Sequence, residues 1–277
     1  MKPAMHSLLG TFLAACSLNK VLAYEQFFSE HILGYQIAGE TQLYHQKGYT
    51  ILKEGQMVLA RRDQFAKNIK VQEAGKEYRL VAVILSTERL RKFALDNNMA
   101  SNKKYGGPKN ILIKPDSFLK GYFLSLLPYI DEERTMSKKM ASIKANEAIE
   151  LLLELKPELE GFLFDFADPD RVDLEEFMMK NFQYNAPIEN FAKLSGRSLS
   201  SFKREFAETF RTTPAKWLKN RRLSEAFYLI QQKNRRPQDI YIELGFENLS
   251  HFYVSFKQKY GQTPAEIKLK DDHWKLP

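Results

Sequence analysis

Two stretches of seven residues decide the fold of the C-terminal third: SSFKREF at residues 200–206 and SHFYVSF at residues 250–256. The first serine and both phenylalanines of one stretch recur in the other after 50 residues. The same spacing relates Pro214 to Pro264 farther along the chain. This ordered set of matches indicates that one structural unit occurs twice.

Each copy contains the parts of a helix-turn-helix. In the first copy, a short helix is predicted from Pro187 to Ser195, because proline suits a first helical position. Gly196 can adopt the positive φ of a tight turn, and the side-chain oxygen of Ser198 can cap a second helix. The second copy has the corresponding parts: a short helix over Pro237–Leu244, then Gly245 and Asn248.

A long helix is predicted between the two copies, beginning at Pro214 and ending near Gln232. Its nineteen residues, at about 1.5 Å each, span roughly 28 Å. One turn of B-DNA is about 34 Å long. The spacing therefore predicts that two recognition helices enter successive major grooves on one side of the duplex, so one polypeptide reads two half-sites without dimerising.

Outer-face residues near the start of a recognition helix can reach base edges. Seven side chains meet this condition: Ser200, Lys203, Arg204, Ser250, His251, Tyr253 and Val254. Arg204 can form a bidentate contact with guanine, worth roughly 1–3 kcal/mol of discrimination. Its counterpart, Val254, can touch a thymine methyl group but cannot donate a hydrogen bond. We therefore expect the first copy to supply most of the base specificity.

A further set of cationic residues is predicted to contact phosphates, which position a protein on DNA without specifying the sequence. The set comprises Arg197, Arg211, Lys216, Lys219, Arg221, Lys257 and Lys259. Two alternatives remain open. The residues can form an ordinary solvated basic face, and Arg221 or Arg222 can instead brace the long helix.

The charge is distributed unevenly along the 277 residues, whose formal net charge is +8. Residues 180–270 carry 17 Lys/Arg and 8 Asp/Glu, whereas residues 131–179 carry 6 and 14. A basic domain thus follows an acidic segment. Basic domains favour polyanionic partners such as nucleic acid, and the alternative is a surface with a simple excess of lysine.

The N-terminal half shows β-strand patterns followed by helical ones. Short β-rich runs separated by turn residues fill residues 35–60, and Tyr78–Leu85 has the pattern of a buried strand. These runs suggest a small antiparallel sandwich or barrel. Helices are predicted over Thr87–Asn97, Ser117–Leu127 and Ser137–Leu155. The apolar stripe of the last helix can form a dimer interface or pack on the barrel. Five aromatic residues can line a pocket or fill the barrel core: Tyr35, Tyr44, Tyr49, Phe65 and Tyr78.

Several classes of protein do not fit the sequence. The five histidines include no pair at a ligating spacing, so no metal and no cofactor is predicted. No catalytic residues are predicted, and an enzyme is not expected. The single cysteine, Cys16, fits a reducing cytoplasm. No stretch of eighteen apolar residues exists that could span a membrane. Leu13–Cys16 looks like a lipoprotein cleavage box, but the apolar run before it is weak, so we expect no export.

About residues 173–268 resemble the DNA-binding domain of the AraC/XylS family of transcription regulators. The residues that carry the resemblance are Ser198, Phe202–Phe206, Arg221–Leu223, Ala226, Ile240, Gly245–Phe246, Ser250–Phe252, Phe256–Lys257, Gly261 and Thr263–Pro264. Two residues depart from the family pattern: Val254 replaces an arginine, and Tyr241 replaces a small alanine. Both departures bear on base reading by the second copy.

The resemblance implies an α+β chain in three parts. Residues 1–165 would form a regulatory and dimerisation domain, a cupin-like β-barrel with helices, similar to that of the family's type III secretion activators. Residues 166–172 would be a linker, and residues 173–270 an all-α DNA-binding domain of two helix-turn-helix units joined by a long helix.

The same resemblance implies a cytoplasmic regulator, an activator and a homodimer in the family's usual form, whose partners are double-stranded DNA and RNA polymerase. The sequence itself leaves open whether transcription rises or falls and what the oligomeric state is. Whether a small-molecule effector or a regulatory protein controls the N-terminal domain stays open. The effector-binding residues are unknown.

Overall fold

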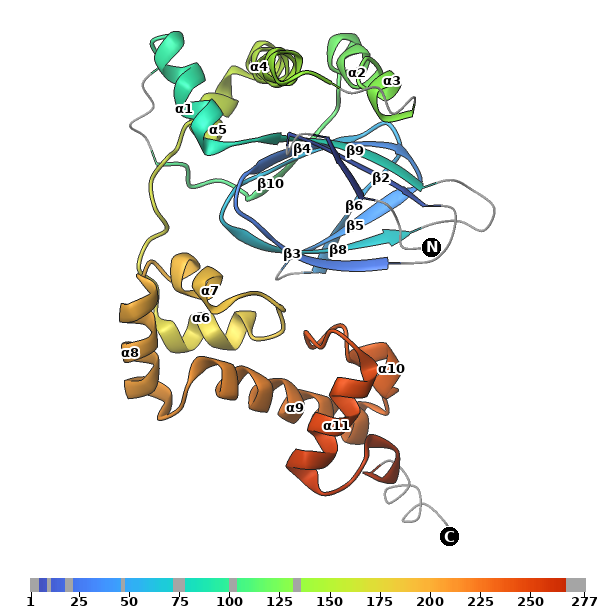
Figure 1. Ribbon diagram of the computed structural model, residues 1–277, viewed down its shortest axis with the longest axis vertical. Coiled ribbons are helices and arrows are strands. Elements are labelled where there is room, and N and C mark those ends of the chain that lie inside the picture. Colours follow the sequence, from blue (N-terminus) through green and yellow to red (C-terminus); the bar gives the residue numbers. More distant parts are fainter. Residues whose placement is uncertain are drawn as a thin grey trace. The chain divides into compact units, whose positions relative to one another are not determined.

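The computed structural model describes residues 5–8, 11–17, 22–45, 48–71, 78–99, 104–131 and 136–267. The chain divides into two compact units, residues 1–167 and 168–277 (Figure 1). The first unit contains all of the described strands, and the second is helical, so the α+β prediction is confirmed. Residues 268–270, the end of the predicted DNA-binding domain, lie outside the described residues, as does His273, one of the five histidines.

A six-stranded antiparallel sheet is the larger of two sheets in the first unit. In spatial order its strands are β1 (Met5–Leu8), β2 (Phe12–Ser17), β9 (Tyr78–Leu85), β4 (His31–Ala38), β7 (Met57–Ala60) and β10 (Asn110–Ile113). Leu33 of β4 pairs with Val83 of β9, and both side chains are fully buried. The centre of this sheet therefore forms one wall of the main core.

A four-stranded antiparallel sheet lies opposite the larger one (Figure 1). Its strands, in order, are β3 (Leu22–Phe28), β8 (Gln64–Val71), β5 (Glu40–His45) and β6 (Gly48–Leu52). Leu43 and Leu52 of this sheet pack against Val58 and Leu80 of the other. Two facing sheets agree with the cupin-like prediction, although the ladders of the described strands do not close into a barrel.

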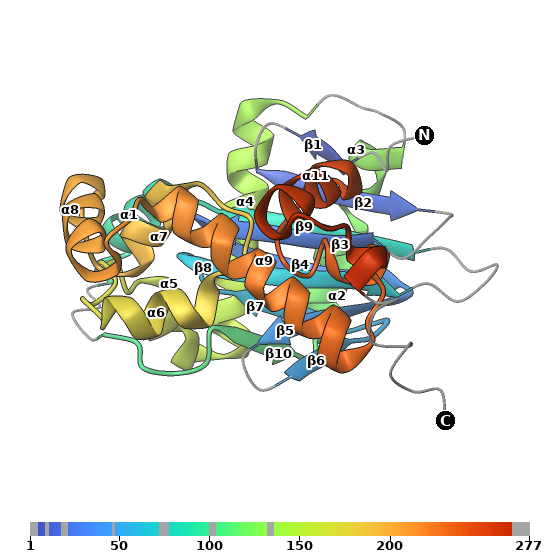
Figure 2. The same cartoon turned by 90° about the horizontal axis from the view of Figure 1, so that it is seen from below.

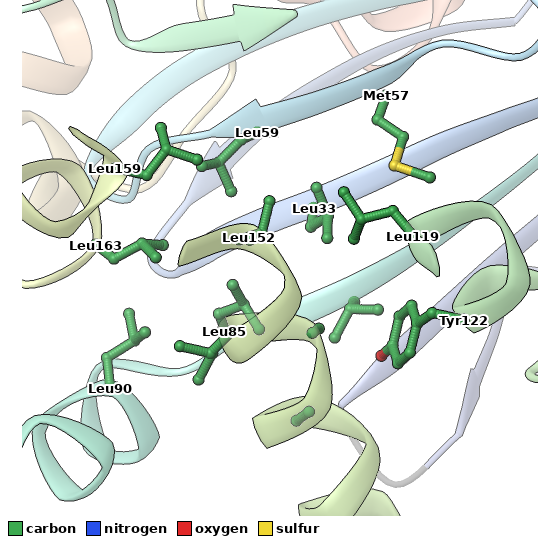
Figure 3. Close-up of a cluster of buried hydrophobic side chains, with 14 of the residues drawn as sticks. Leu33, Met57, Leu59, Leu85, Leu90, Leu119, Tyr122, Leu152, Leu159 and Leu163 are labelled. Atoms are coloured by element: carbon green, nitrogen blue, oxygen red, sulfur yellow. The ribbon is translucent and has the colours of Figure 1, made fainter. Parts of the chain in front are cut away.

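Helices cover the outer face of the six-stranded sheet (Figure 1). They are α1 (Thr87–Asp96), α2 (Ser117–Leu124), α3 (Leu127–Asp131), α4 (Lys138–Leu155) and α5 (Glu160–Leu163), with the 3₁₀ helix η1 (Pro157–Leu159) before α5. Figure 3 shows Leu33, Leu59 and Leu85 of the strands beside Leu119 and Leu152 of the helices. This apolar layer is the main core of the first unit.

The helix α4 packs much of its apolar stripe inside its own unit. Ser137 caps the helix, accepting a hydrogen bond from the N–H of Met140 at 3.1 Å. Ala148 and Leu152 are fully buried against the sheet, whereas Ile143 is 50% exposed. Most of the stripe considered as a dimer interface is therefore covered by the unit's own core, which leaves dimerisation as a prediction.

All of the regular elements in the described part of the second unit are helices. They are α6 (Leu174–Asn181), α7 (Ile188–Leu194), α8 (Leu199–Phe210), α9 (Pro214–Lys233), α10 (Pro237–Ile240) and α11 (Leu249–Tyr260). The long helix α9 begins at the predicted proline and ends at Lys233, followed by the cap residue Asn234, whose φ is 52°. α10 is shorter than predicted because residues 241–245 form turns. Figure 2 shows α9 passing between α8 and α11.

Candidate nucleic-acid interface

The turns of the two helix-turn-helix units have the same backbone geometry. In the first, the N–H of Arg197 donates to the carbonyl oxygen five residues earlier at 3.0 Å, and Gly196 has a φ of 70°. In the second, the N–H of Phe246 donates in the same way at 3.0 Å, and Gly245 has a φ of 75°. Both turns therefore have the hydrogen-bonding pattern of a Schellman motif, which extends the duplication to the backbone.

Both recognition helices, α8 and α11, are capped by the polar residues that the sequence indicates. Ser198 Oγ accepts from the N–H of Ser201 at 3.2 Å, and Asn248 Oδ1 accepts from the N–H of His251 at 2.7 Å. Each cap satisfies an amide that has no partner within its helix. The caps thus fix the first turn of each helix, where base-reading residues are expected.

Paired phenylalanines attach each recognition helix to α9. Four side chains are fully buried: Phe202, Phe206, Phe252 and Phe256. The ring of Phe206 meets that of Trp217 edge to face, with centroids 5.8 Å apart. The ring of Phe256 is stacked with that of Phe227 at 6.4 Å. Both recognition helices therefore rest on one helix, with their opposite faces turned outward.

The outer face of α8 presents Ser200, Lys203 and Arg204, all of them exposed. Residues three and four apart lie on one face of a helix. Neither Lys203 nor Arg204 forms an ion pair or a side-chain hydrogen bond with another residue that the structure describes. Both cationic groups are therefore available to a polyanion.

The outer face of α11 is different in character. Ser250, His251 and Val254 are exposed, and the exposed fraction of Val254 is 67%. Tyr253 is half-buried, with its ring edge-on to that of Phe252 at 5.9 Å. This face offers a small apolar group and few donors, whereas α8 offers two cations.

The predicted phosphate contacts fall into two groups. Arg211, Lys216 and Lys257 are exposed and form no ion pair within the described parts of the chain. Lys259 donates to the carbonyl oxygen of Asn220 at 2.6 Å and to Ser224 Oγ at 2.8 Å, which ties α11 to α9. Three further cations also have protein partners: Lys219, Arg221 and Arg197.

Two of these three cations are partly accessible. Lys219 Nζ lies 3.4 Å from Gln258 Oε1. Arg221 pairs with Glu225 at 3.0 Å and lies over the ring of Phe182, 4.4 Å from its centroid. Such contacts on a surface contribute little free energy, so either side chain can still turn toward a phosphate.

Arg197 is nearly buried. Only 4% of its side chain is exposed, and its Nε and Nη2 atoms donate to the Glu205 carboxylate at 3.0 and 2.6 Å. Its Nη1 atom donates to the carbonyl oxygens of Val172 and Ser195 at 2.9 and 2.6 Å. The geometry therefore favours a structural role, and phosphate contact by Arg197 stays an untested prediction.

Arg222 is a bracing residue, one of the two alternatives left open by the sequence. Its guanidinium donates to the carbonyl oxygens of Phe182 and Tyr184 at 2.7 Å each, and to that of Gly245 at 3.1 Å. It thereby joins α9, the loop after α6 and the turn of the second helix-turn-helix. The planar five-donor group of arginine suits such a threefold contact.

Arg211 was predicted as a phosphate contact, but its backbone conformation was not. It ends α8 with a φ of 53°, in the left-handed region that side chains disfavour. The residue 50 positions later, Gly261, ends α11 with a φ of 71°. Only that comparison within the repeat could have indicated the strained position of Arg211 from sequence.

In the first unit, a polar cluster crosses the space between the two sheets. Thr41 Oγ1 donates to Gln36 Oε1 at 2.7 Å and lies 2.8 Å from the hydroxyl of Tyr78. Lys70 Nζ lies 4.8 Å from the centroid of the Tyr78 ring. These four residues are buried. The polar atoms of the cluster thus contact one another within the protein.

The five aromatic residues considered as a pocket lining do not gather. Tyr35 packs against Phe123 on the helical side of the sheet, while the rings of Tyr44 and Tyr49 pair with each other. Within the described residues, no group of three or more His, Cys, Asp or Glu could hold a metal ion. In the same residues, no helix has the length and apolarity needed to cross a membrane.

Two family models match the chain. One, described as the ExsA N-terminal regulatory domain, matches residues 31–162. The other, described as a helix-turn-helix domain, matches residues 191–269. The first of these regions lies in the first unit, and the second contains α8, α9 and α11.

Curated relatives are similar to part of the chain. The virulence regulon transcriptional activator VirF of Yersinia enterocolitica is 30% identical over 125 residues, which cover 43% of this chain and 46% of the relative. The HTH-type transcriptional regulator ExsA of Pseudomonas aeruginosa is 28% identical over 99 residues, 36% of each protein. The chain thus spans about half the length of these relatives, or less.

Among solved structures, ToxT from Vibrio cholerae is similar over 94% of this chain and 98% of its own, with 13% identity and a TM-score of 0.40.

Proposed function

The chain belongs to the AraC/XylS family of transcription regulators, and we propose that it regulates transcription by reading DNA with two helix-turn-helix units. The observation that carries this proposal is the pair of capped recognition helices, α8 and α11, packed on α9 with their outer faces exposed. Residues 1–165 would regulate and dimerise, 166–172 would link, and 173–270 would bind DNA. The proposed role is not enzymatic.

Within the interface, each residue has a proposed task. Arg204 would read guanine through a bidentate contact, and Lys203 would contact guanine or phosphate. Val254 would touch a thymine methyl group. Arg211, Lys216 and Lys257 are the strongest phosphate candidates, since they are exposed and unpaired within the described residues. Four further residues would lie at base edges: Ser200, Ser250, His251 and Tyr253.

Selection of DNA by the full chain tests this proposal. The protein would select duplexes from a random library, and its affinity for the selected site would be compared with that for unselected duplex at one stated salt concentration. We expect two half-sites with centres about 10–10.5 base pairs apart. Selected duplexes that bind no more tightly than random ones would remove the proposal of sequence-specific regulation.

We further propose that the protein activates transcription in the cytoplasm through RNA polymerase, as a homodimer. The name of one relative, a transcriptional activator, supports the direction of the effect. Transcription in vitro from a template carrying the selected site tests it. Added protein should raise transcript yield, and a fall in yield would indicate a repressor.

Two kinds of signal could control the first unit: a small-molecule effector or a regulatory protein. The contacts among Gln36, Thr41 and Tyr78 favour the regulatory protein, since these buried polar groups already pair with one another. The melting temperature of the full chain, measured with a panel of metabolites, separates the two. A reproducible rise with one compound would support a small effector and remove the alternative.

A further inference from the structure

The segment Asp170–Val172 lies against the turn of the first helix-turn-helix. A Cβ atom built on Gly196 would stand 2.5 Å from the amide nitrogen of Arg171 and 2.6 Å from the carbonyl group of Asp170. The N–H of Val172 donates to the carbonyl oxygen of Ser195 at 3.4 Å. This short segment, here called the connector, therefore packs backbone to backbone on the turn.

Glu205 joins the connector to the recognition helix. It is the residue after Arg204 on α8, and its carboxylate accepts hydrogen bonds from Arg197 at 2.6 and 3.0 Å. Arg171 of the connector donates to the same carboxylate at 2.6 Å. Arg197 also holds the carbonyl oxygen of Val172 at 2.9 Å. The Glu205 carboxylate on α8 thus pairs with two arginines. Arg171 belongs to the connector, and Arg197 donates a hydrogen bond to the connector.

The charge state of Glu205 suits this task. Hydrogen bonds from Arg197 lower the pKa of the Glu205 carboxyl to about 2, and Arg171 adds to the effect. The carboxylate therefore remains ionised throughout the pH range in which DNA binding is measured. A clamp made of charge-assisted hydrogen bonds is stronger than one made of neutral groups.

Small rotations of α8 matter for base reading. A side-chain end about 6 Å from a helix axis moves by about 2 Å when the helix turns by 20°. Binding sites require their contacts to be held within about 0.5 Å and 10–20° of the working geometry. A contact that fixes the rotation of α8 therefore determines whether Arg204 meets its base in register.

The second helix-turn-helix is held differently. A Cβ atom on its turn glycine, Gly245, would stand 2.5 Å from the carbonyl oxygen of Gln183 and 3.0 Å from the guanidinium of Arg222. Both neighbours belong to the helical part of the second unit. The turn of the first helix-turn-helix thus packs on the connector, whereas the turn of the second packs on α9 and the loop after α6.

On the N-terminal side, the chain is anchored just before the connector. Arg62 Nη2 in the first unit donates to the carbonyl oxygens of Asp165 and Ala167 at 3.3 and 3.0 Å. Only Asp168 and Pro169 separate this anchor from the connector.

We propose that Glu205 is a positioning residue: together with Arg171 and Arg197 it fixes α8 on the connector, so that the connector sets how well Arg204 and Lys203 discriminate between bases. The inference rests on the proposed DNA-binding function. It adds a structural route by which a change in the connector alters base reading by one recognition helix and leaves the other unaffected.

A pair of charge-matched variants of the full chain tests the inference. Glu205→Gln removes the clamp, and Glu208→Gln serves as the control. Glu208 lies on the same helix, is exposed, and forms no ion pair or side-chain hydrogen bond within the described residues. Each change removes one negative charge near the DNA, so the two variants have the same net charge. Glu205→Gln should lower the ratio of selected-site to random-duplex affinity by about tenfold, the effect of one base contact, relative to the control. The random-duplex affinities of the two variants should agree within about twofold.

Equal discrimination ratios for the two variants would overturn the inference. Hydrogen exchange on the protein without DNA gives a separate reading: the amides of Val172 and Arg197 should exchange faster in Glu205→Gln than in the control, and equal rates would also count against the clamp. If the wild type itself prefers no sequence, the proposed function fails, whereas the exchange rates still decide whether the clamp exists.

A milder variant covers the case in which Glu205→Gln does not fold. The side chain of Arg171 is 65% exposed, so Arg171→Gln leaves no cavity. Its control is Arg235→Gln, which breaks a comparable ion pair with Glu243 at the second helix-turn-helix. Discrimination should fall in Arg171→Gln and stay nearer the wild-type value in the control. The reverse order would contradict the inference.

Discussion

Arg204 and Val254 occupy corresponding places on the two recognition helices, and both are exposed. Arg204→Ala should lower the preference for the selected site by about 5- to 150-fold, since it removes a bidentate base contact. Val254→Ala should have a smaller effect, because it removes only an apolar contact. Titrations with selected and random duplexes measure both. Equal losses of discrimination would contradict the unequal division of base reading.

Gly196 and Gly261 have nearly the same positive φ, 70° and 71°, but different surroundings. Gly261→Ala should destabilise the second unit by about 1 kcal/mol, the usual penalty for a side chain in the left-handed region. Gly196→Ala should cost more than twice as much, because the new Cβ would also overlap the backbone of Asp170 and Arg171.

Urea unfolding followed by tryptophan fluorescence measures this difference, since Trp217 lies in α9 of the second unit and the sequence has no tryptophan before it. Similar midpoints for the two variants would show that the connector does not press on the turn.

His31 is a buried histidine in the first unit, and its Nε2 atom bonds to the carbonyl oxygen of Phe162 at 3.1 Å. Burial lowers the pKa of His31 to about 3. The unfolded chain, with a histidine pKa near 6.5, therefore binds more protons between pH 6.5 and 3. The contribution of the neutral His31 side chain to the free energy of unfolding is complete above pH 6.5 and declines as the pH falls toward 3. Between pH 7 and 5 the loss should be on the order of 1–2 kcal/mol.

Urea unfolding followed by circular dichroism at pH 7 and pH 5 checks this dependence. The transition to compare is that of the first unit, which tryptophan fluorescence does not detect. His31→Gln should reduce the pH dependence. His251→Gln, a change on the exposed face of α11, should leave it unaltered. A first unit whose stability is the same at both pH values would refute the assignment to His31.

At the scale of elements, α9 holds the second unit together through Arg222 as well as through its apolar face. Arg222→Lys should destabilise this unit by about 2–4 kcal/mol, because one ammonium group cannot serve three carbonyl oxygens arranged for a guanidinium. Arg221→Lys is the control, since its ion pair is partly exposed and should cost less than about 1 kcal/mol. The shift in melting temperature measures both, and comparable shifts would deny Arg222 its bracing role.

The elements also show how far the sequence predicts the fold. The caps Ser198 and Asn248 are encoded locally by a polar residue before an apolar pattern, and the structure confirms them. No strand was predicted at β1, β2, β3 or β10. Length alone does not explain this, because the four-residue strand β7 lies in a predicted range. Three of these strands pair with strands far along the chain, β2 with β9, β3 with β8 and β10 with β7, and β1 pairs with β2.

The candidate site was predictable to a similar extent. The exposed positions of Lys203 and Arg204 follow from helical spacing relative to the buried phenylalanines, as the sequence predicted. The buried position of Arg197 did not follow, because it depends on Glu205 and on a carbonyl oxygen of the connector. Contacts of that kind leave no periodic pattern in a sequence.

At the scale of the whole molecule, positive charge on the second unit should make DNA binding depend on salt. The slope of log affinity against log salt is negative, and it should become less negative by about 0.9 for each phosphate contact removed. Arg211→Ala, Lys216→Ala and Lys257→Ala should each approach this change. Lys92→Ala, which removes an exposed lysine of the first unit, is the control and should leave the slope unaltered.

Affinity measured at four salt concentrations gives the slope for each variant. An unchanged slope in all three variants of the second unit would remove them from the DNA interface.

The connector also bears on how regulators of this kind can exchange parts. Because Asp170–Val172 packs on the turn of the first helix-turn-helix, the DNA-reading module begins before α6, the first helix of the second unit. A recombination joint at Asp173 would join the DNA-binding domain to a foreign segment in place of its own connector. A joint at Asp168 or Pro169 would transfer the DNA-binding domain together with the connector. Gene fusions that keep the connector with α8 should thus inherit the parent's operator preference intact.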